Sequence, residues 1–148
     1  DGFHPKNALV VPPPVAAVEH FLSMVRLPLK AQVVILGRKS VFTKLLQARF
    51  AARKWKTSVI RSNWTRQTRQ ADVIVTVLGR GPRLVATDVK PGVVVVDVGI
   101  RSMNGKTAGD VDPSVWTKAK AVTPVPGGIG PMTIYSVLQN TYLLASRL

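Results

Sequence analysis

Residues 122–133 carry the residue types in this chain that most clearly indicate a binding site. Three prolines and three glycines fall in the order Val-Thr-Pro-Val-Pro-Gly-Gly-Ile-Gly-Pro-Met-Thr. Prolines fix φ and remove backbone donors, whereas glycines allow a positive φ or the close approach of a ligand. Residues 134–144 follow directly with a helical pattern, and a rigid loop aimed at a helix start commonly binds anions or other ligands. The run could also simply brace the final helix, and we favour that bracing role.

A second group of residues could bind a polyanion. The chain has a net charge of +14, and its sequence contains no acidic residue between Glu19 and Asp72 but twelve basic ones. Self-repulsion of this size would be relieved by nucleic acid, by an acidic protein surface or by an anionic membrane. We favour RNA over a merely well-solvated basic surface. The predicted RNA-binding residues are Lys39, Lys44, Arg49, Arg53, Lys54, Lys56, Arg61, Arg66 and Arg69.

Composition excludes several other classes of protein. The 148 residues are 46% hydrophobic, which is enough for one domain with a core and unlike a disordered tail. Absence of cysteine from the sequence rules out disulfides and thiolate chemistry, and only two histidines leave little for a metal site. The longest apolar runs are too short to cross a bilayer, so we expect no membrane insertion.

The elements that must position these residues alternate between helices and buried strands. Apolar, β-branched runs that end in glycine are typical of strands buried on both faces of a parallel sheet. We therefore predict an α/β fold with a Rossmann-like parallel sheet covered by helices on both faces. The expected strands are 32–37, 57–61, 71–79 and 93–99, and the expected helices are 15–26, 43–55 and 131–146.

Three of these strands end in glycine, at Gly37, Gly79 and Gly99. Ligands of open α/β sheets gather at the carboxyl ends of strands. Each glycine alone is better read as a turn residue, but together the three suggest a dinucleotide-binding ancestry.

Several ordered motifs resemble one family. The chain is similar to the C-terminal, NAD(P)-binding domain of the bifunctional methylenetetrahydrofolate dehydrogenase/cyclohydrolase family. The matching segments are Asp1–Pro5 with Asn7, Thr68–Gly79, Lys90–Ile100, Gly109–Asp112 and residues 123–133. The resemblance implies a Rossmann-like fold that binds NAD(P), with folate in the cleft against the family's other domain. It implies vestigial cofactor-binding residues at Gly37, Arg38, Gly79, Gly99, Ile100 and Thr133.

The chain also departs from the family pattern. The family's catalytic lysine lies in a Tyr-x-x-x-Lys motif of its N-terminal domain, and no such motif occurs in this sequence. In the phosphate loop, Lys39 replaces a serine, Thr43 the second glycine and Leu45 a proline. A Cβ at position 43 would crowd an approaching pyrophosphate. The family's His-Ser-x-Thr segment reads Ser62–Thr65 here and lacks the histidine.

From these departures and the basic residues we predict a single, degenerate domain over residues 1–148 without the family's N-terminal catalytic domain. Its expected role is a non-catalytic subunit of a large ribonucleoprotein, a mitochondrial ribosome component in the matrix that contacts rRNA and neighbouring proteins. That interpretation implies no catalytic residues, no cofactor and no metal. The alternative is a cofactor-binding domain or fragment of an active NAD(P)-dependent enzyme, in which the glycines of the 122–133 run face folate and nicotinamide.

The sequence leaves two roles open, that of Arg38 with Lys39 and that of Trp64. A domain that binds a nucleotide without chemistry could use Arg38 and Lys39 to hold a 2′-phosphate. Trp64, which lies between Arg61 and Arg66 in the sequence, could stack on a base or pack in the core.

Overall fold

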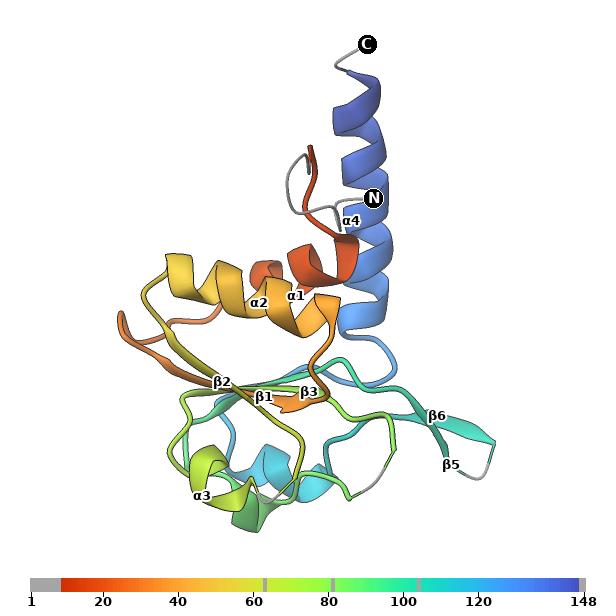
Figure 1. Ribbon diagram of the computed structural model, residues 1–148. Helices are drawn as coiled ribbons and strands as arrows, with labels where there is room; N and C mark the ends of the chain where they lie inside the picture. Colours follow the sequence, from red (N-terminus) through yellow and green to blue (C-terminus); the bar gives the residue numbers. More distant parts are fainter. Residues whose placement is uncertain (1–8, 63, 81, 104, 147–148) are drawn as a thin grey trace.

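The computed structural model describes residues 9–62, 64–80, 82–103 and 105–146 (Figure 1). The matching segment Asp1–Pro5 with Asn7 lies outside these residues. A five-stranded parallel sheet in the order β2-β1-β3-β4-β7 forms the centre of the fold. Its strands are β1 (Gln32–Gly37), β2 (Lys56–Ile60), β3 (Val73–Val77), β4 (Val94–Asp97) and β7 (Ala121–Val122). The predicted Rossmann-like α/β class is confirmed.

Strand β1 shows why the sheet is buried on both faces. Val33 and Ile35 belong to the core on one face, whereas Val34 and Leu36 belong to the core on the other. Successive side chains of a strand point to opposite faces, so a run of consecutive apolar residues requires cover on both sides.

One face is covered by long helices. Figure 1 shows α1 (Pro13–Ser23) and α2 (Val41–Ala52) over the sheet, while α4 (Ile129–Ala145) packs along α1 and rises away from the sheet. Helix α1 begins with proline in its first turn, where a missing N–H leaves no hydrogen bond unmade. Helix α1 therefore begins two residues earlier than predicted. Helix α2 also begins two residues earlier than predicted, directly after its N-cap Ser40.

The opposite face is covered by short elements. These are α3 (Thr65–Thr68) and two 3₁₀ helices, η1 (Ala86–Asp88) and η2 (Pro113–Thr117). Trp64 is only 8% exposed and packs in the core on this face. Of the two roles considered for this tryptophan, core packing is the one seen.

A two-stranded antiparallel hairpin extends from the end of β4 (Figure 1). Its strands are β5 (Arg101–Met103) and β6 (Lys106–Ala108), neither of which was predicted from the sequence. None of the helices in the described part of the chain combines the length and apolar composition needed to cross a bilayer.

Candidate functional site

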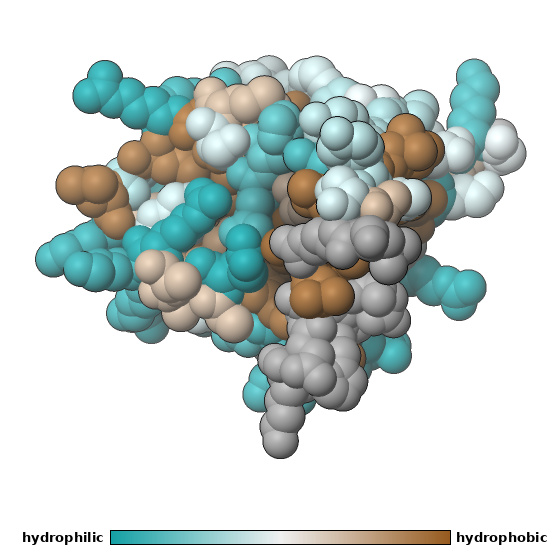
Figure 2. Space-filling model, turned by 90° about the horizontal axis from the view of Figure 1, so that it is seen from above, coloured by the Kyte–Doolittle hydropathy of each residue, from teal (hydrophilic) through white to brown (hydrophobic). Residues whose placement is uncertain are grey.

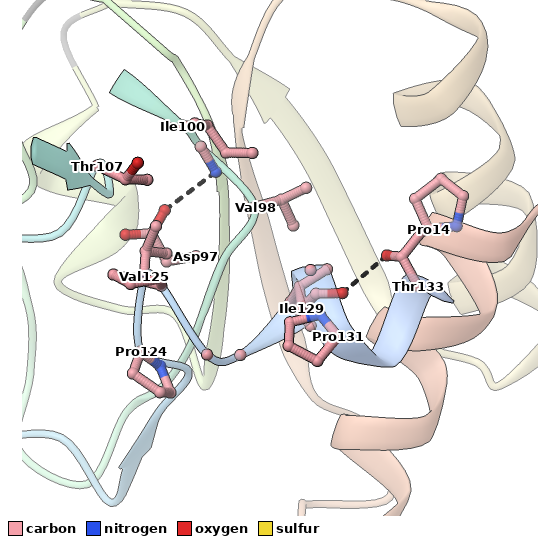
Figure 3. Close-up of a pocket in the computed structure, with 15 residues that line it drawn as sticks. Pro14, Asp97, Val98, Ile100, Thr107, Pro124, Val125, Ile129, Pro131 and Thr133 are labelled. Atoms are coloured by element: carbon pink, nitrogen blue, oxygen red, sulfur yellow. Dashed lines mark hydrogen bonds between the residues drawn. The ribbon is translucent and has the colours of Figure 1, made fainter. Parts of the chain in front are cut away.

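Two cavities lie along the carboxyl edge of the parallel sheet. The first, of about 510 Å³, lies at the ends of β1, β2 and β3 and is called the basic cavity here. It is lined by Gly37, Arg38, Ser40, Arg61, Trp64, Val77, Leu78, Arg80 and Pro82. The second, of about 370 Å³, lies at the end of β4 and the loop after β7 and is called the apolar cavity (Figure 3). It is lined by Pro14, Thr107, residues 97–100, residues 124–131 and Thr133.

Strand order explains why the cavities form here. The chain runs from β1 outward to β2 and then returns to β3 on the other side of β1. Connections therefore leave in opposite directions between β1 and β3, and ligands of open α/β sheets bind outside the strand ends at such a switch point. The basic cavity spans this point, and the apolar cavity lies over the neighbouring β4 and β7.

Guanidinium groups dominate the charge of the basic cavity. Arg38, Arg61 and Arg80 follow three neighbouring strands, all three are exposed, and none of the described lining residues is acidic. Buried Trp64 supplies an apolar wall. Arginine presents a planar fork of donors that suits a phosphate, so this cavity fits an anionic ligand.

The start of α2 at this cavity is closed by its own side chains. The Ser40 N–H donates to Thr43 Oγ1 at 2.8 Å, and the Thr43 N–H donates to Ser40 Oγ at 3.2 Å, which is a capping box. Ser40 is therefore the N-cap of α2. The Thr43 side chain is buried, and its hydroxyl also lies 3.2 Å from the Arg38 carbonyl oxygen.

The proline- and glycine-rich run forms much of the wall of the apolar cavity (Figure 3). A Cβ on Gly128 would lie 2.5 Å from the Pro124 carbonyl oxygen, so only glycine fits this turn of the loop. The same run leads into α4 at Ile129, and the Thr133 hydroxyl donates to the Ile129 carbonyl at 2.8 Å. The loop therefore starts the final helix and lines a cavity at the same time.

Asp97, which was not predicted from the sequence as a site residue, lines the apolar cavity (Figure 3). Its carboxylate accepts hydrogen bonds from the Thr76 hydroxyl at 2.8 Å and from the N–H groups of Gly99, Asp110 and Val111 at 3.0–3.1 Å. Burial raises the pKa of Asp97, and the nearby Asp110 carboxylate adds to the rise, while the hydrogen bonds lower the pKa in part.

Asp110 joins this arrangement to β3. Its fully buried carboxylate accepts the N–H groups of Leu78 at 2.6 Å and Gly79 at 3.0 Å, and it pairs with Arg101. A Cβ on Gly99 would lie 1.8 Å from Asp110 Oδ2. Gly99 is therefore required by the close approach of a carboxylate within the chain.

Five of the six predicted cofactor residues line one of the cavities. Gly37 and Arg38 line the basic cavity, and Gly99, Ile100 and Thr133 line the apolar one. Gly79 lines neither of the two, and its N–H is bound to Asp110. Arg61 and Arg80 line the basic cavity although neither had been predicted to contact a cofactor.

The predicted RNA-binding residues do not form one face. Arg49 on α2 donates from its Nε to Glu19 at 2.9 Å. Arg53, which directly follows α2, lies 3.7 Å from the same carboxylate and 5.3 Å from the Trp55 ring centroid. Lys56 begins β2, whereas Arg61 follows its carboxyl end. Lys39 lies in the β1–α2 loop, Lys44 lies in the first turn of α2, and Lys54 follows that helix. Arg66 lies in α3 and Arg69 directly follows it. Since α2 and α3 cover opposite faces of the sheet, these charges point to different sides.

Comparison with known proteins places this arrangement in a family. Residues 12–148 match the family model described as the NAD(P)-binding domain of tetrahydrofolate dehydrogenase/cyclohydrolase. The chain belongs to this family. The resemblance to this family that the sequence motifs indicated is therefore confirmed. The relatives described below are folate dehydrogenase/cyclohydrolases, so the predictions of a ribosomal, RNA-binding subunit were wrong, and the mitochondrial location stays a prediction.

Individual relatives agree with the family match. The bifunctional protein FolD of Streptococcus mutans is 38% identical over 162 residues, covering 99% of this chain and 57% of the relative. The crystal structure of the FolD dehydrogenase/cyclohydrolase from Campylobacter jejuni is 34% identical with a TM-score of 0.88, covering 100% of this chain and 58% of that one. The Trypanosoma brucei enzyme, solved with NADP cofactor and an inhibitor, is 30% identical with a TM-score of 0.83, covering 96% of this chain and 52% of that one. The chain thus spans a little over half the length of these relatives.

Proposed function

We propose that this chain is the NAD(P)-binding part of a methylenetetrahydrofolate dehydrogenase/cyclohydrolase and that the cofactor lies along the carboxyl edge of the sheet. The observation that carries the proposal is the pairing of a basic cavity with a neighbouring apolar one. A nicotinamide dinucleotide has the same two-part character, because its phosphates are anionic and its nicotinamide ring is flat and largely apolar. The family match supports this interpretation of the two cavities, because the matching family model describes an NAD(P)-binding domain.

The residues present fit such a cofactor. Arg38 and Arg61 are placed to hold phosphate groups in the basic cavity, and the backbone of Gly99 and Ile100 with the turn before Thr133 would border the ring. When bound, the nicotinamide would accept a hydride from the folate substrate. The chain's own part is to bind the cofactor, orient the ring and keep one wall of the reaction site apolar.

The proton-transfer residue should come from elsewhere in the protein. Among the described residues that line the apolar cavity, Asp97 is the only ionisable one. Its carboxylate already accepts four hydrogen bonds and is only 3% exposed, so it is poorly placed to exchange protons with a substrate. We therefore propose that catalysis needs the portion of the relatives that this chain does not match.

Helix α4 supports such a second part. Its 17 residues include no charged side chain, although 19% of the whole chain is charged. Ile134, Tyr135, Leu138 and Tyr142 are 58–73% exposed. Figure 2, which looks down on the end of the molecule from which α4 rises, shows hydrophobic patches between hydrophilic side chains. A contiguous set of large, exposed apolar side chains commonly marks an interaction surface, so we propose that the remainder of the two-domain enzyme covers it.

Calorimetric titration of the purified protein with NADP and NAD tests the proposal. We expect saturable binding of one cofactor per chain. Ile100→Asp should weaken that binding about tenfold, because a carboxylate would face the apolar cavity. Met103→Asp is the matched control, since Met103 is also an exposed apolar residue, on β5, but does not line the cavity. Absence of saturable binding of either dinucleotide would overturn the proposal.

A further inference from the structure

Asp97 carries the only charge among the described residues that line the apolar cavity (Figure 3). It is the last residue of β4 and is only 3% exposed. The other described lining residues are apolar side chains, glycines and two threonines. A ligand in this cavity therefore meets a negative charge in the described wall and no positive one.

The contacts of Asp97 favour its ionised form. All four of its hydrogen bonds come from neutral donors, namely the Thr76 hydroxyl and the N–H groups of Gly99, Asp110 and Val111. Burial raises the pKa of Asp97, but a protonated carboxyl would place its own O–H against one of these donors. The arrangement of donors thus suits a carboxylate.

The charge of this carboxylate is not neutralised by a neighbour. Among the described residues, Asp97 forms no ion pair, and Arg101 pairs with Asp110 instead. These three side chains together carry one net negative charge next to the cavity. Because the cavity wall is apolar, the charge acts there with less screening than it would in water.

The two redox forms of a nicotinamide dinucleotide differ in charge at the end that the proposed binding mode places in this cavity. The oxidised nicotinamide ring carries one positive charge, whereas the reduced ring is neutral. Both forms have the same phosphates, riboses and adenine. Contacts in the basic cavity therefore contribute equally to the binding of both forms.

We propose that Asp97 makes this site selective for the oxidised form of the cofactor over the reduced form. The inference rests on the proposed cofactor-binding function and adds a specificity-determining residue to its apolar end. Asp97 exchanges no proton in this role, because a fixed charge is enough to attract a cationic ring. A ring that has accepted a hydride is neutral and loses this attraction, so the reduced cofactor is bound less tightly.

Titration of wild type and Asp97→Asn with NADP⁺ and with NADPH tests the inference. The quantity compared is the ratio of the two dissociation constants, reduced form over oxidised form. It should exceed one in wild type and fall about tenfold in Asp97→Asn, because only the oxidised form loses an attraction. A general loosening of the fold would instead weaken both forms and leave the ratio unchanged.

Asp88→Asn is the matched control for this comparison. It makes the same change at a half-buried carboxylate that lines neither cavity. Its ratio should stay within about twofold of wild type. Thermal unfolding of the three proteins checks that each is folded.

A second pair of variants leaves Asp97 in place and decides the question if Asp97→Asn does not fold. Thr107 is exposed on β6 and lines the same cavity. Thr107→Lys adds a positive charge there and should lower the ratio about threefold or more. Thr107→Met adds a side chain of similar length without charge and should leave the ratio within about twofold of wild type.

Three results would overturn the inference while leaving the proposed function intact. They are wild-type protein that binds NADPH as tightly as NADP⁺, a folded Asp97→Asn variant with an unchanged ratio, and equal ratios in Thr107→Lys and Thr107→Met. Wild-type protein that binds neither form would instead reject the proposed function, and this inference with it.

Discussion

Asp97 and Asp110 hold together the strand ends that border both cavities. Asp97 connects β4 to β3 through the Thr76 hydroxyl and to the 109–111 segment through two N–H groups. Asp110 in turn accepts the N–H groups of Leu78 and Gly79 just beyond β3. An ionised carboxylate can only accept hydrogen bonds, so these two side chains suit positions that are surrounded by N–H and O–H donors.

We predict that Asp97→Asn destabilises the protein by about 1–3 kcal/mol. The new amide NH₂ would face at least one N–H donor and leave it unsatisfied in a buried site. Chemical denaturation followed by far-UV circular dichroism measures the change. Asp88→Asn removes the same charge from a half-buried position and should cost less; an equal loss in the two variants would contradict the role given to Asp97.

The ion pair between Asp72 and Lys90 makes a pH-dependent contribution to the stability of the folded state. Burial alone would raise the pKa of Asp72, but the Gln32 N–H and the Lys90 ammonium, 2.7 Å away, together hold that pKa below its ordinary value of 3.8. A carboxyl whose pKa is depressed by folding stabilises the folded state above its ordinary pKa. That stabilisation is lost as the pH falls through the lowered value.

Lys90→Met should therefore lower stability at neutral pH by less than about 1 kcal/mol, since the pair is partly exposed. The difference from wild type should shrink as the pH falls below about 4, where the carboxyl of the variant and then that of wild type become protonated. Urea denaturation at a series of pH values measures this difference. A gap that stayed constant into acid would show that Lys90 acts through packing rather than charge.

At the scale of the elements, strands with β-branched runs were predictable and short strands without them were not. Strands β1 to β4 each contain a run of β-branched residues, which the sequence displays directly. The β5–β6 hairpin and two-residue β7 lack such runs and depend on neighbours far along the chain. Helix α4 begins two residues before Pro131, because proline fits the first turn of a helix without losing a hydrogen bond.

Glu19 connects α1 to α2 and shows a contact that sequence patterns could not reveal. The carboxylate is 9% exposed and binds Arg49, 30 residues further along the chain. We predict that Glu19→Gln lowers the free energy of unfolding by about 1–2 kcal/mol, because Arg49 and Arg53 would lose their counterion.

A double-mutant cycle with Arg49→Met separates this pair from other effects. Its coupling energy, measured from urea denaturation of the two single variants and the double variant, should be positive and should shrink in high salt. Additive single effects would contradict a direct ion pair.

At the scale of the whole molecule, the net charge of +14 was over-interpreted from the sequence. An uninterrupted basic interval in a sequence predicts a basic face only if the fold keeps it on one side. Here α2 and α3 lie on opposite faces of the sheet, and Glu19 lies against α2 from outside the interval. The carboxyl-edge site was predictable from Gly37, Arg38, Gly99 and the 122–133 run, whereas Asp97 and Asp110 depend on contacts made only in the fold.

The same charge predicts a salt dependence of stability. Repulsion among 21 basic side chains, balanced by only 7 acidic ones, should weaken the folded state at low ionic strength. We expect the melting temperature to rise as sodium chloride increases from about 0.02 M to about 0.5 M, because the screening length falls over that range. Differential scanning fluorimetry measures the shift; a melting temperature that stayed flat or fell would contradict net self-repulsion.

The division of the sheet edge into two cavities has a consequence for redesign. Neither cavity shares a described lining residue with the other. In the proposed binding mode, the charged end of the cofactor and the end with the reactive ring are therefore bound by separate sets of side chains, one supplied by residues 37–82 and the other mainly by residues 97–133. An engineer could exchange the first set to accept a different electron carrier while leaving the second set, and the geometry of the reacting ring, untouched.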